Sequence, residues 1–248
     1  MNRLGIIDWG IGGVSIYKLV KEKLGDIPVT YFSDTGATPY GKMSRVELIA
    51  RLDSVIEHLK TRGVTHIVIG CNAASTAIPL LKDHGIPVEG VIESAVEMTA
   101  KLRPARLGLI GGRRTVVSGV YRKAFAGHDI NVEQRIAQPL SGLIESGDMS
   151  SQHLRDEARR ILAPIRNSSH ILLACTHYPA ILPVIVKLVS PTTIFIDPSG
   201  AVLKKIAKWR LSSNGDDEFL TSGVSAAMKK AAKAAFGVKI DRITRCRH

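Results

Sequence analysis

The sequence predicts an α/β protein with two pseudosymmetric domains, each a mostly parallel sheet flanked by helices. Three observations support this fold class. Short apolar runs alternate with longer helical patterns, the alternation restarts near the middle of the chain, and two separate segments recur at almost the same offset. Strands that alternate with helices form parallel sheets, because each connection between parallel strands crosses over the sheet. In such sheets a ligand binds beyond the carboxyl ends of the strands.

The first half of the chain contains four apolar runs of strand length and two longer helical patterns. The predicted strands are Leu4–Asp8, Val29–Ser33, His66–Gly70 and Val88–Ile92. The predicted helices are Val14–Leu24 and Met43–Thr61. Ser44 is expected to cap the second helix, because Glu47 three residues later completes a capping box. We expect a Gly-rich turn after the first strand and a further helical stretch after Cys71.

The second half of the chain repeats the first. LGLI at 107–110 matches LGII at 4–7 with an offset of 103 residues, and SHILLAC at 169–175 matches THIVIGC at 65–71 with an offset of 104. Two independent segments with nearly one offset indicate a duplicated α/β half. The duplication places Cys71 and Cys175 beyond equivalent strands, so we expect them on opposite sides of one active-site cleft between the domains. Cys246 has no partner in the repeat and is expected to lie outside that cleft.

The composition is that of a globular protein. Hydrophobic residues make up 45% and charged residues 23% of the 248 residues, which excludes a disordered or collagen-like chain. No run of about 18 apolar residues is present, so no membrane span is expected. The N-terminus lacks the cleavage site of a signal peptide. Three cysteines make no disulfide scaffold, and we expect a cytoplasmic, reducing location.

The net charge of +12 raises the question of a nucleic-acid partner. Residues 203–248 hold 11 Lys and Arg against 4 Asp and Glu, a net charge of +7, so over half of the excess lies in the C-terminal segment. That segment has neither zinc-finger spacing nor an aromatic RNA-binding signature. We therefore expect a solvated basic surface and no nucleic-acid partner.

The paired cysteines are the main candidates for chemistry. Each follows a predicted strand and precedes a predicted helix, and a helix N-terminus can lower the pKa of a thiol toward neutrality. Two alternatives are a buried structural role and a metal site formed by Cys71, Cys175 and His177. The spacing is not that of a typical zinc site, and no metal is expected. Two thiols on opposite faces of a ligand can remove a proton from one face and deliver one to the other, which inverts a stereocentre.

The chain resembles the glutamate racemase family, within the aspartate/glutamate racemase superfamily. The segments LGIIDWGIGGVS, YFSDTGATPYGK, IGCNAAST, GVIES, LGLIGGRRTVVS and ACTHYP have the order and spacing of that family, and the resemblance extends from Leu4 to about Gly237. It implies a racemase that needs no pyridoxal phosphate or other cofactor. It also implies that residues 93–202 form a second domain inserted into the first, which comprises residues 1–92 and 203–248.

The resemblance also assigns residues to the site. The catalytic positions match Cys71, Cys175, Asp8, His177 and Glu145. The substrate-contacting positions match Pro39, Tyr40, Gly41, Asn72, Thr115 and Thr176. Donors of this kind would stabilise the carbanion that forms when an amino acid loses its α-proton. From the residue pattern alone, Asp8 also suits a helix cap and Glu145 an exposed helix acid.

Two substrate positions depart from the family pattern. Trp9 stands where the family usually has serine, and Ala73 stands where it usually has threonine. The loss of a hydrogen bond to a charged ligand costs roughly 1.5–3 kcal/mol. If the Trp9 ring points into the pocket, it reshapes the pocket, so a racemase of aspartate or another acidic amino acid is the alternative to glutamate. If the ring points away, glutamate binding is retained.

Two other classes of function remain open at this stage. Gly10 and Gly12 follow a strand, and Asp34 lies 22 residues after Gly12, which imitates a dinucleotide-binding fingerprint without its third glycine. A non-catalytic relative is the other class, favoured by Trp9 and Ala73. For a glutamate racemase, the expected partners are a small acidic amino acid and, as the family suggests, a second subunit in a homodimer. Its product D-glutamate would serve cell-wall (peptidoglycan) synthesis or a secondary-metabolite pathway.

Overall fold

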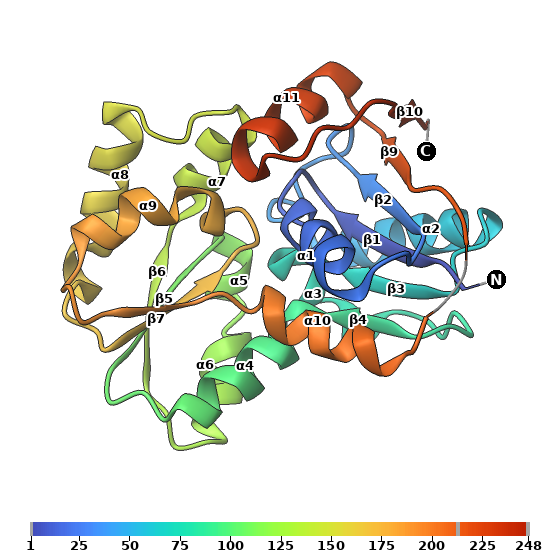
Figure 1. The fold of residues 1–248 in the computed structure, drawn as a ribbon. Coiled ribbons are helices and arrows are strands. Elements are labelled where there is room, and N and C mark those ends of the chain that lie inside the picture. The colour runs from blue at the N-terminus through green and yellow to red at the C-terminus, as the bar shows by residue number, and fades with distance from the viewer. Residues whose placement is uncertain (1, 212–213, 247–248) are drawn as a thin grey trace.

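Two parallel sheets stand next to each other in this chain, each covered by helices on both faces (Figure 1). The structure is a computed structural model that describes residues 2–211 and 214–246. It confirms the predicted α/β class with two mostly parallel sheets. Within those residues, none of the helices has both the length and the apolar character that are needed to cross a bilayer.

The larger sheet has six parallel strands in the order β10-β9-β2-β1-β3-β4. Its strands are β1 (Leu4–Asp8), β2 (Val29–Ser33), β3 (His66–Ile69), β4 (Val88–Gly90), β9 (Glu218–Thr221) and β10 (Thr244–Arg245). Its helices are α1 (Val14–Leu24), α2 (Arg45–Thr61), α3 (Asn72–Ser75), α10 (Ser199–Lys208) and α11 (Ser225–Phe236), with the 3₁₀ turn η1 (Ile78–Leu80). Strands from both ends of the sequence thus share one sheet, because β9 pairs with β2.

The smaller sheet has four parallel strands in the order β6-β5-β7-β8. Its strands are β5 (Leu107–Gly111), β6 (Val132–Ile136), β7 (His170–Ala174) and β8 (Ile194–Ile196). Its helices are α4 (Val91–Leu102), α5 (Arg113–Val117), α6 (Val120–Ala126), α7 (Gln138–Glu145), α8 (Gln152–Leu162) and α9 (Leu182–Ile185). The 3₁₀ turns are η2 (Ala163–Ile165), η3 (Tyr178–Ile181) and η4 (Val186–Leu188).

The strand order and register confirm the duplication. The order β6-β5-β7-β8 repeats β2-β1-β3-β4, and equivalent residues have equivalent partners across the strands. Leu4 is paired with Val29 and His66, and Leu107 is paired with Val132 and His170. These pairings reproduce the offsets of 103 and 104 residues that the sequence shows. The ends of β3 and β7 therefore occupy equivalent positions in the two sheets.

Apolar side chains fill the layers between sheets and helices. One face of the larger sheet packs against α2, and the opposite face packs against α1, α10 and α11. The smaller sheet packs against α4 and α6 on one face and against α7 and α8 on the other. A single cluster of buried apolar residues runs from the α1 face of the first sheet to the α7 face of the second. The two halves therefore share part of their core, which limits how far they can separate.

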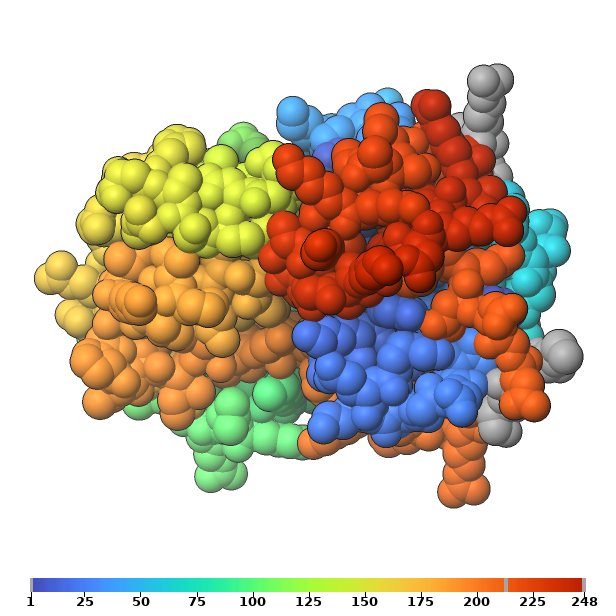
Figure 2. Space-filling model, turned by 45° about the horizontal axis from the view of Figure 1, so that its top comes forward, coloured from blue at the N-terminus to red at the C-terminus, as the bar shows by residue number. Residues whose placement is uncertain are grey.

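The chain passes between the halves in helices. The predicted domain boundaries at 92/93 and 202/203 fall inside α4 and α10, which pack against each other. Helix α11 contacts both α1 and α7, so the C-terminal segment covers the junction of the halves (Figure 2). The boundaries themselves stay a prediction.

Most predicted elements of the first half agree with the structure. Val14–Leu24 and the first two strands have the predicted bounds, and the third strand ends one residue earlier than predicted. The strand predicted at Val88–Ile92 is too long, because it ends at Gly90 and α4 begins at Val91. The helical stretch after Cys71 is a single turn followed by η1. The apolar pattern did not separate the end of a buried strand from the first turn of a buried helix.

The capping box at the start of α2 gives a test of this fold. Ser44 Oγ accepts a hydrogen bond from the Glu47 amide at 3.2 Å, and the Glu47 carboxylate accepts one from the Ser44 amide at 2.7 Å. We expect Ser44→Ala to lower the free energy of unfolding by about 1 kcal/mol, measured by urea denaturation. Ser44→Asp keeps an oxygen that can cap the helix and should lose little. Equal losses in both variants would contradict the role of the cap.

Candidate active site

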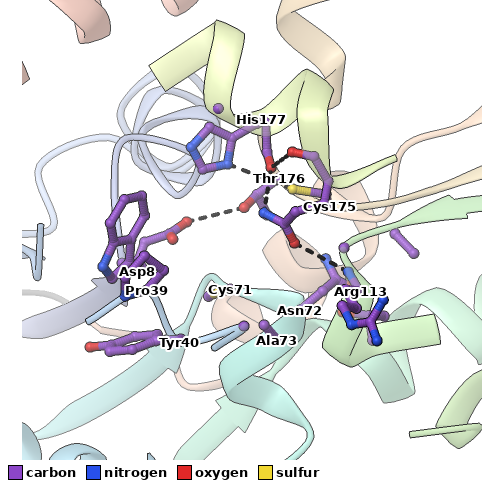
Figure 3. Close-up of a pocket in the computed structure, with 18 of the residues that line it drawn as sticks. Asp8, Pro39, Tyr40, Cys71, Asn72, Ala73, Arg113, Cys175, Thr176 and His177 are labelled. Atoms are coloured by element: carbon purple, nitrogen blue, oxygen red, sulfur yellow. Dashed lines mark hydrogen bonds between the residues drawn. The ribbon is translucent and has the colours of Figure 1, made fainter. Parts of the chain in front are cut away.

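A cavity of about 350 Å³ lies between the two sheets, at the carboxyl ends of their strands. Figure 3 shows side chains from both halves converging on it. Its lining includes all the sequence-predicted site residues except Glu145, namely Asp8, Trp9, Pro39, Tyr40, Gly41, Cys71, Asn72, Ala73, Thr115, Cys175, Thr176 and His177. The sequence repeat, together with the rule that ligands bind beyond the carboxyl ends of parallel strands, thus predicts the position of the observed cavity.

The two cysteines of the repeat line this cavity from different sheets. Cys71 follows β3 and precedes the first residue of α3, and Cys175 follows β7. Both thiols are free and partly exposed. Cys246 is buried in the α2 layer and does not line the cavity. The duplicated fold therefore brings two thiols to one space from opposite halves.

The position of Cys71 in the cavity wall affects its pKa. Desolvation of the Cys71 thiol raises its pKa well above its usual value, and the Asp8 charge raises it further. The amides of Ala73 and Ala74 act in the opposite direction but do not outweigh burial. The amides at the start of α3 therefore lower the pKa in part, as predicted, but the predicted net fall toward neutrality is wrong for Cys71. The reason is that α3 has only four residues and packs against α4, α5 and Tyr121 of the second half.

Asp8 holds the turn that follows β1. Its carboxylate accepts hydrogen bonds from the Gly13 amide at 2.6 Å and the Gly10 amide at 3.3 Å. It also accepts one at 3.1 Å from the Thr176 hydroxyl of the other half. Burial raises the pKa of Asp8, although the nearby His177 lowers it in part. Asp8 therefore does support the start of α1, as the capping alternative requires, but it also lies in the cavity wall beside Cys71.

His177 and Glu145 form a second pair of titratable groups, beside Cys175. His177 Nδ1 lies 3.6 Å from Cys175 Sγ, and His177 Nε2 lies 2.7 Å from Glu145 Oε2. Burial lowers the pKa of His177, but its hydrogen bonds to Cys175 and Glu145 outweigh that effect and raise the pKa well above its usual value. An imidazole of this kind can hold a proton next to the sulfur.

Glu145 does not line the cavity but lies behind His177. Its Oε2 accepts a hydrogen bond from the amide of Ile11 at 3.0 Å, in the turn after β1. Its side chain is mostly buried, at 18% exposure, so Glu145 is no exposed helix acid. The Glu145 carboxylate therefore binds both the His177 imidazole and the turn after β1, which belongs to the first half.

Among the residues that the structure describes, two buried polar atoms of the cavity wall have no hydrogen-bond partner. The hydroxyl of Tyr121 donates to Asn72 Oδ1 at 2.6 Å, which leaves Asn72 Nδ2 unpaired within the described residues. The hydroxyl of Thr115 is also buried without a partner there. Burial raises the pKa of Tyr121, so its phenol stays protonated and keeps donating. Since buried polar groups are rarely left unpaired, these two donors fit the oxygens of a bound ligand.

Trp9 forms part of the wall and does not point away from the site. It lines the cavity together with Ala73, and its indole Nε1 donates to the carbonyl of Ala37 at 3.1 Å. Because that hydrogen is already used, the ring offers the cavity an apolar surface. The two departures from the family pattern therefore replace two hydroxyls with apolar groups inside the site.

Sequence reasoning missed several residues of the site. The cavity is also lined by Lys42, Gly112, Arg113, Gln138, Ser141, Gly142 and Ala174. Gln138 Oε1 accepts from the Arg113 amide at 3.1 Å, which joins the starts of α5 and α7. Lys42 follows the predicted site residue Gly41, and Arg113 lies two residues before Thr115. Their cationic character was the one signal in the sequence that could have indicated them.

The glycines after β1 are explained by close packing and not by a dinucleotide. A Cβ on Gly12 would lie 2.4 Å from Thr176 Oγ1 and 2.6 Å from His177 Nδ1, and a Cβ on Gly10 would lie 2.2 Å from Glu145 Oε2. The second half thus occupies the space that a pyrophosphate would need. Asp34, the expected ribose ligand of that alternative, is already bonded to Arg51. The dinucleotide alternative is therefore not supported.

The metal alternative has no support from the geometry either. In the part of the chain that the structure describes, no three His, Cys, Asp or Glu side chains are grouped so that they could hold a metal ion. His177 instead uses its two nitrogens toward Cys175 and Glu145.

The raised pKa of His177 depends on Glu145, which gives a test of this pair. Glu145→Gln keeps the shape of the side chain but removes its charge, so we expect the pKa of His177 to fall. The measurement is an NMR titration of the His177 ring. An unchanged titration would show that Glu145 does not act on the imidazole.

The Glu145→Gln variant also tests how the unfolding free energy depends on pH. A pKa that is higher in the folded state stabilises the fold fully below the unfolded value of about 6.5, and this stabilisation is lost as the pH rises through the folded value. The wild type should therefore exceed Glu145→Gln in unfolding free energy most at pH values below about 6.5. A difference that grows with rising pH would contradict this sign.

Comparisons with known proteins agree with this fold. Residues 4–205 match the Asp/Glu/hydantoin racemase family. The chain is 31% identical to a glutamate racemase from Carboxydothermus hydrogenoformans, over 97% of this chain and 94% of that one. The crystal structure of glutamate racemase from Francisella tularensis in complex with D-glutamate matches with a TM-score of 0.89 at 24% identity, over 99% and 97% of the two chains. Glutamate racemase from Aquifex pyrophilus matches with a TM-score of 0.82 at 27% identity, over 99% and 98%. The chain therefore belongs to the Asp/Glu/hydantoin racemase family.

Proposed function

We propose that this chain interconverts L- and D-glutamate by a two-base mechanism in which Cys71 and Cys175 act from opposite sides of the α-carbon. The observation that supports this most directly is the pair of free thiols that line one cavity from equivalent strand ends of two pseudosymmetric halves. A single thiol could remove a proton, but inversion requires that another group return one on the opposite face. The two-cysteine pattern is consistent with a racemase of this family.

In this mechanism one cysteine, as the thiolate, removes the α-proton of the substrate. The other cysteine, as the thiol, can donate a proton. The bond from the α-carbon to hydrogen breaks, the hydrogen moves to sulfur as a proton, and its electron pair stays on the substrate as a carbanion beside the α-carboxylate. The opposite S–H then delivers its proton to the other face. The raised pKa of Cys71 makes it the proton donor in the resting site. The reverse direction requires that the two cysteines exchange roles.

The neighbouring groups adjust the protonation of each sulfur. On the first side, the Asp8 carboxylate adds to the raised pKa of Cys71, and it can hold a proton itself because its own pKa is raised. On the second side, His177 can donate to or accept from Cys175 through Nδ1, while Glu145 holds Nε2. Each thiol thus has one titratable neighbour that adjusts its state between turnovers.

The substrate is a dicarboxylic amino acid in this proposal. Asn72 Nδ2 and the Thr115 hydroxyl are unpaired within the described residues and suit one carboxylate. Charge that develops on this carboxylate in the transition state would be stabilised by such fixed donors in a site that excludes water. Lys42 and Arg113 line the cavity from opposite halves and add positive charge for an acidic substrate.

Aspartate remains a second candidate because Trp9 lies in the wall. A large apolar ring in place of a small residue favours a shorter substrate, whereas the curated relative and the solved structures named above are glutamate racemases. We favour glutamate on that ground. We further propose that the enzyme works as a homodimer in the cytoplasm, where its thiols stay reduced, and that its D-glutamate serves cell-wall synthesis.

Single cysteine variants test the mechanism. Cys71→Ala and Cys175→Ala should each lower the rate of glutamate inversion by roughly 10²–10⁴-fold, because each removes one of the two proton carriers. The rate is followed by circular dichroism from both enantiomers. Cys246→Ala is the matched control, since this thiol lies outside the cavity, and it should keep the wild-type rate. Full activity in both cavity variants would rule out the two-base mechanism.

Deuterium incorporation tests the same mechanism independently of mutation. In D₂O, the product enantiomer should carry solvent deuterium at the α-carbon from the first turnovers, because the returned proton comes from the second thiol. The remaining starting enantiomer should gain little at that stage, since its own proton goes to a different sulfur. Mass spectrometry of the separated enantiomers measures this, and equal early labelling of both would indicate a single base.

The Trp9 variants decide between the two substrates. Trp9→Ser opens the wall and adds a hydroxyl, so we expect the ratio of kcat/KM for glutamate to that for aspartate to rise by about tenfold. Trp9→Phe keeps an apolar ring and should change this ratio much less. If the ratio is the same in all three proteins, Trp9 does not set the length of the substrate.

A further inference from the structure

Arg114 connects the two halves at the edge of the cavity. It is the second residue of α5, follows a strand of the smaller sheet, and is half-buried. Its guanidinium nevertheless donates to two backbone carbonyls of the other half: Nε donates to that of Tyr40 at 2.9 Å, and a terminal nitrogen donates to that of Met43. Both acceptors of Arg114 are backbone carbonyls and not side chains of the cavity wall. The proposed mechanism does not involve Arg114.

Arg114 contacts the segment 39–43, of which residues 39–42 line the cavity. Its turn is closed by the Lys42 amide, which donates to the carbonyl of Pro39 at 2.7 Å. Within the described residues, the amides of Tyr40 and Gly41 have no acceptor, although both residues line the cavity. They are therefore available to a ligand, provided that the turn is held in place.

The turn has a firm anchor on its own half. The Tyr40 hydroxyl donates to Asp34 Oδ2 at 2.8 Å, and Arg51 binds the same carboxylate through two nitrogens. Ser222 also donates to Asp34, at 2.7 Å. This network fixes the Tyr40 side chain but not the carbonyls of Tyr40 and Met43, which accept from Arg114 of the other half. Arg114 supplies the second anchor, from across the cavity.

We propose that Arg114 is a positioning residue that holds the 39–43 turn over the cavity so that its backbone can contact the substrate. The inference rests on the proposed function for the substrate. Arginine suits this role because its planar group presents several donors in a fixed fork, which can reach two carbonyls at once. A lysine at this position could reach one of them. The residue acts on substrate binding through the turn and takes no part in proton transfer.

Kinetics of the Arg114 variants test this role. Arg114→Ala should raise the KM for glutamate by about tenfold or more, which is the effect of losing hydrogen bonds from a charged donor. The value of kcat should fall much less, because the thiols and their neighbours are untouched. Arg114→Lys should recover part of the loss. Arg122→Ala is the matched control, since it removes one exposed positive charge from α6, outside the cavity, and should leave both constants unchanged.

Hydrogen exchange gives a readout that does not depend on activity. The amides of Lys42 and Met43, which donate to the Pro39 carbonyl within the turn, should exchange faster in Arg114→Ala than in the wild type, whereas amides of β3 and β7 should not change. An unchanged KM together with unchanged exchange in residues 39–43 would overturn the inference. So would a loss confined to kcat, or acceleration throughout the protein, which would indicate a general structural role.

The two proposals can fail separately. If the wild type inverts glutamate but Arg114→Ala binds it equally well, the proposed function stands and the positioning role does not. If the wild type inverts no acidic amino acid, the proposed function fails, and hydrogen exchange still decides whether Arg114 holds the turn. If Arg114→Ala does not fold, Arg114→Lys carries the same measurements.

Discussion

The site depends on the contact between the glycine-rich turn after β1 and three residues of the other half. Asp8 accepts from Thr176, Glu145 accepts from Ile11, and His177 holds Glu145 from the opposite side. These hydrogen bonds are possible only because Gly10 and Gly12 have no side chains to obstruct them. The same contact closes the space between the two sheets and brings the two thiols to one cavity.

This contact also encloses several titratable groups, and their pKa values reflect it. Burial raises the pKa values of Asp8 and Cys71, whereas at His177 two hydrogen bonds outweigh burial. Desolvation disfavours the charged form of a carboxyl or a thiol, so both groups keep their protons to a higher pH than they would in water.

Much of this arrangement could be predicted from the sequence, because it follows from repetition. The offset between Cys71 and Cys175 gave their equivalent positions, and parallel sheets place equivalent strand ends on the same side. The pKa of Cys71 could not be predicted, because it depends on how completely the other half encloses α3. Tyr121 and Arg114 were missed for the same reason. Their partners are 49 and 71 to 74 residues away in sequence, and no local pattern marks such contacts.

The fold is nearly symmetric, but the two thiols do not have symmetric neighbours. With the offset of 103 residues, the position equivalent to Asp8 is Gly111, and with the offset of 104 the position equivalent to His177 is Ala73. The titratable neighbour of each thiol therefore stands at a position whose equivalent in the other half has no titratable side chain. An acid lies beside one sulfur and an imidazole beside the other, and the nearby His177 lowers the pKa of Asp8 in part against the effect of burial. The duplication thus supplies two thiols that line one cavity, and the divergence of the two halves gives each thiol a different titratable neighbour.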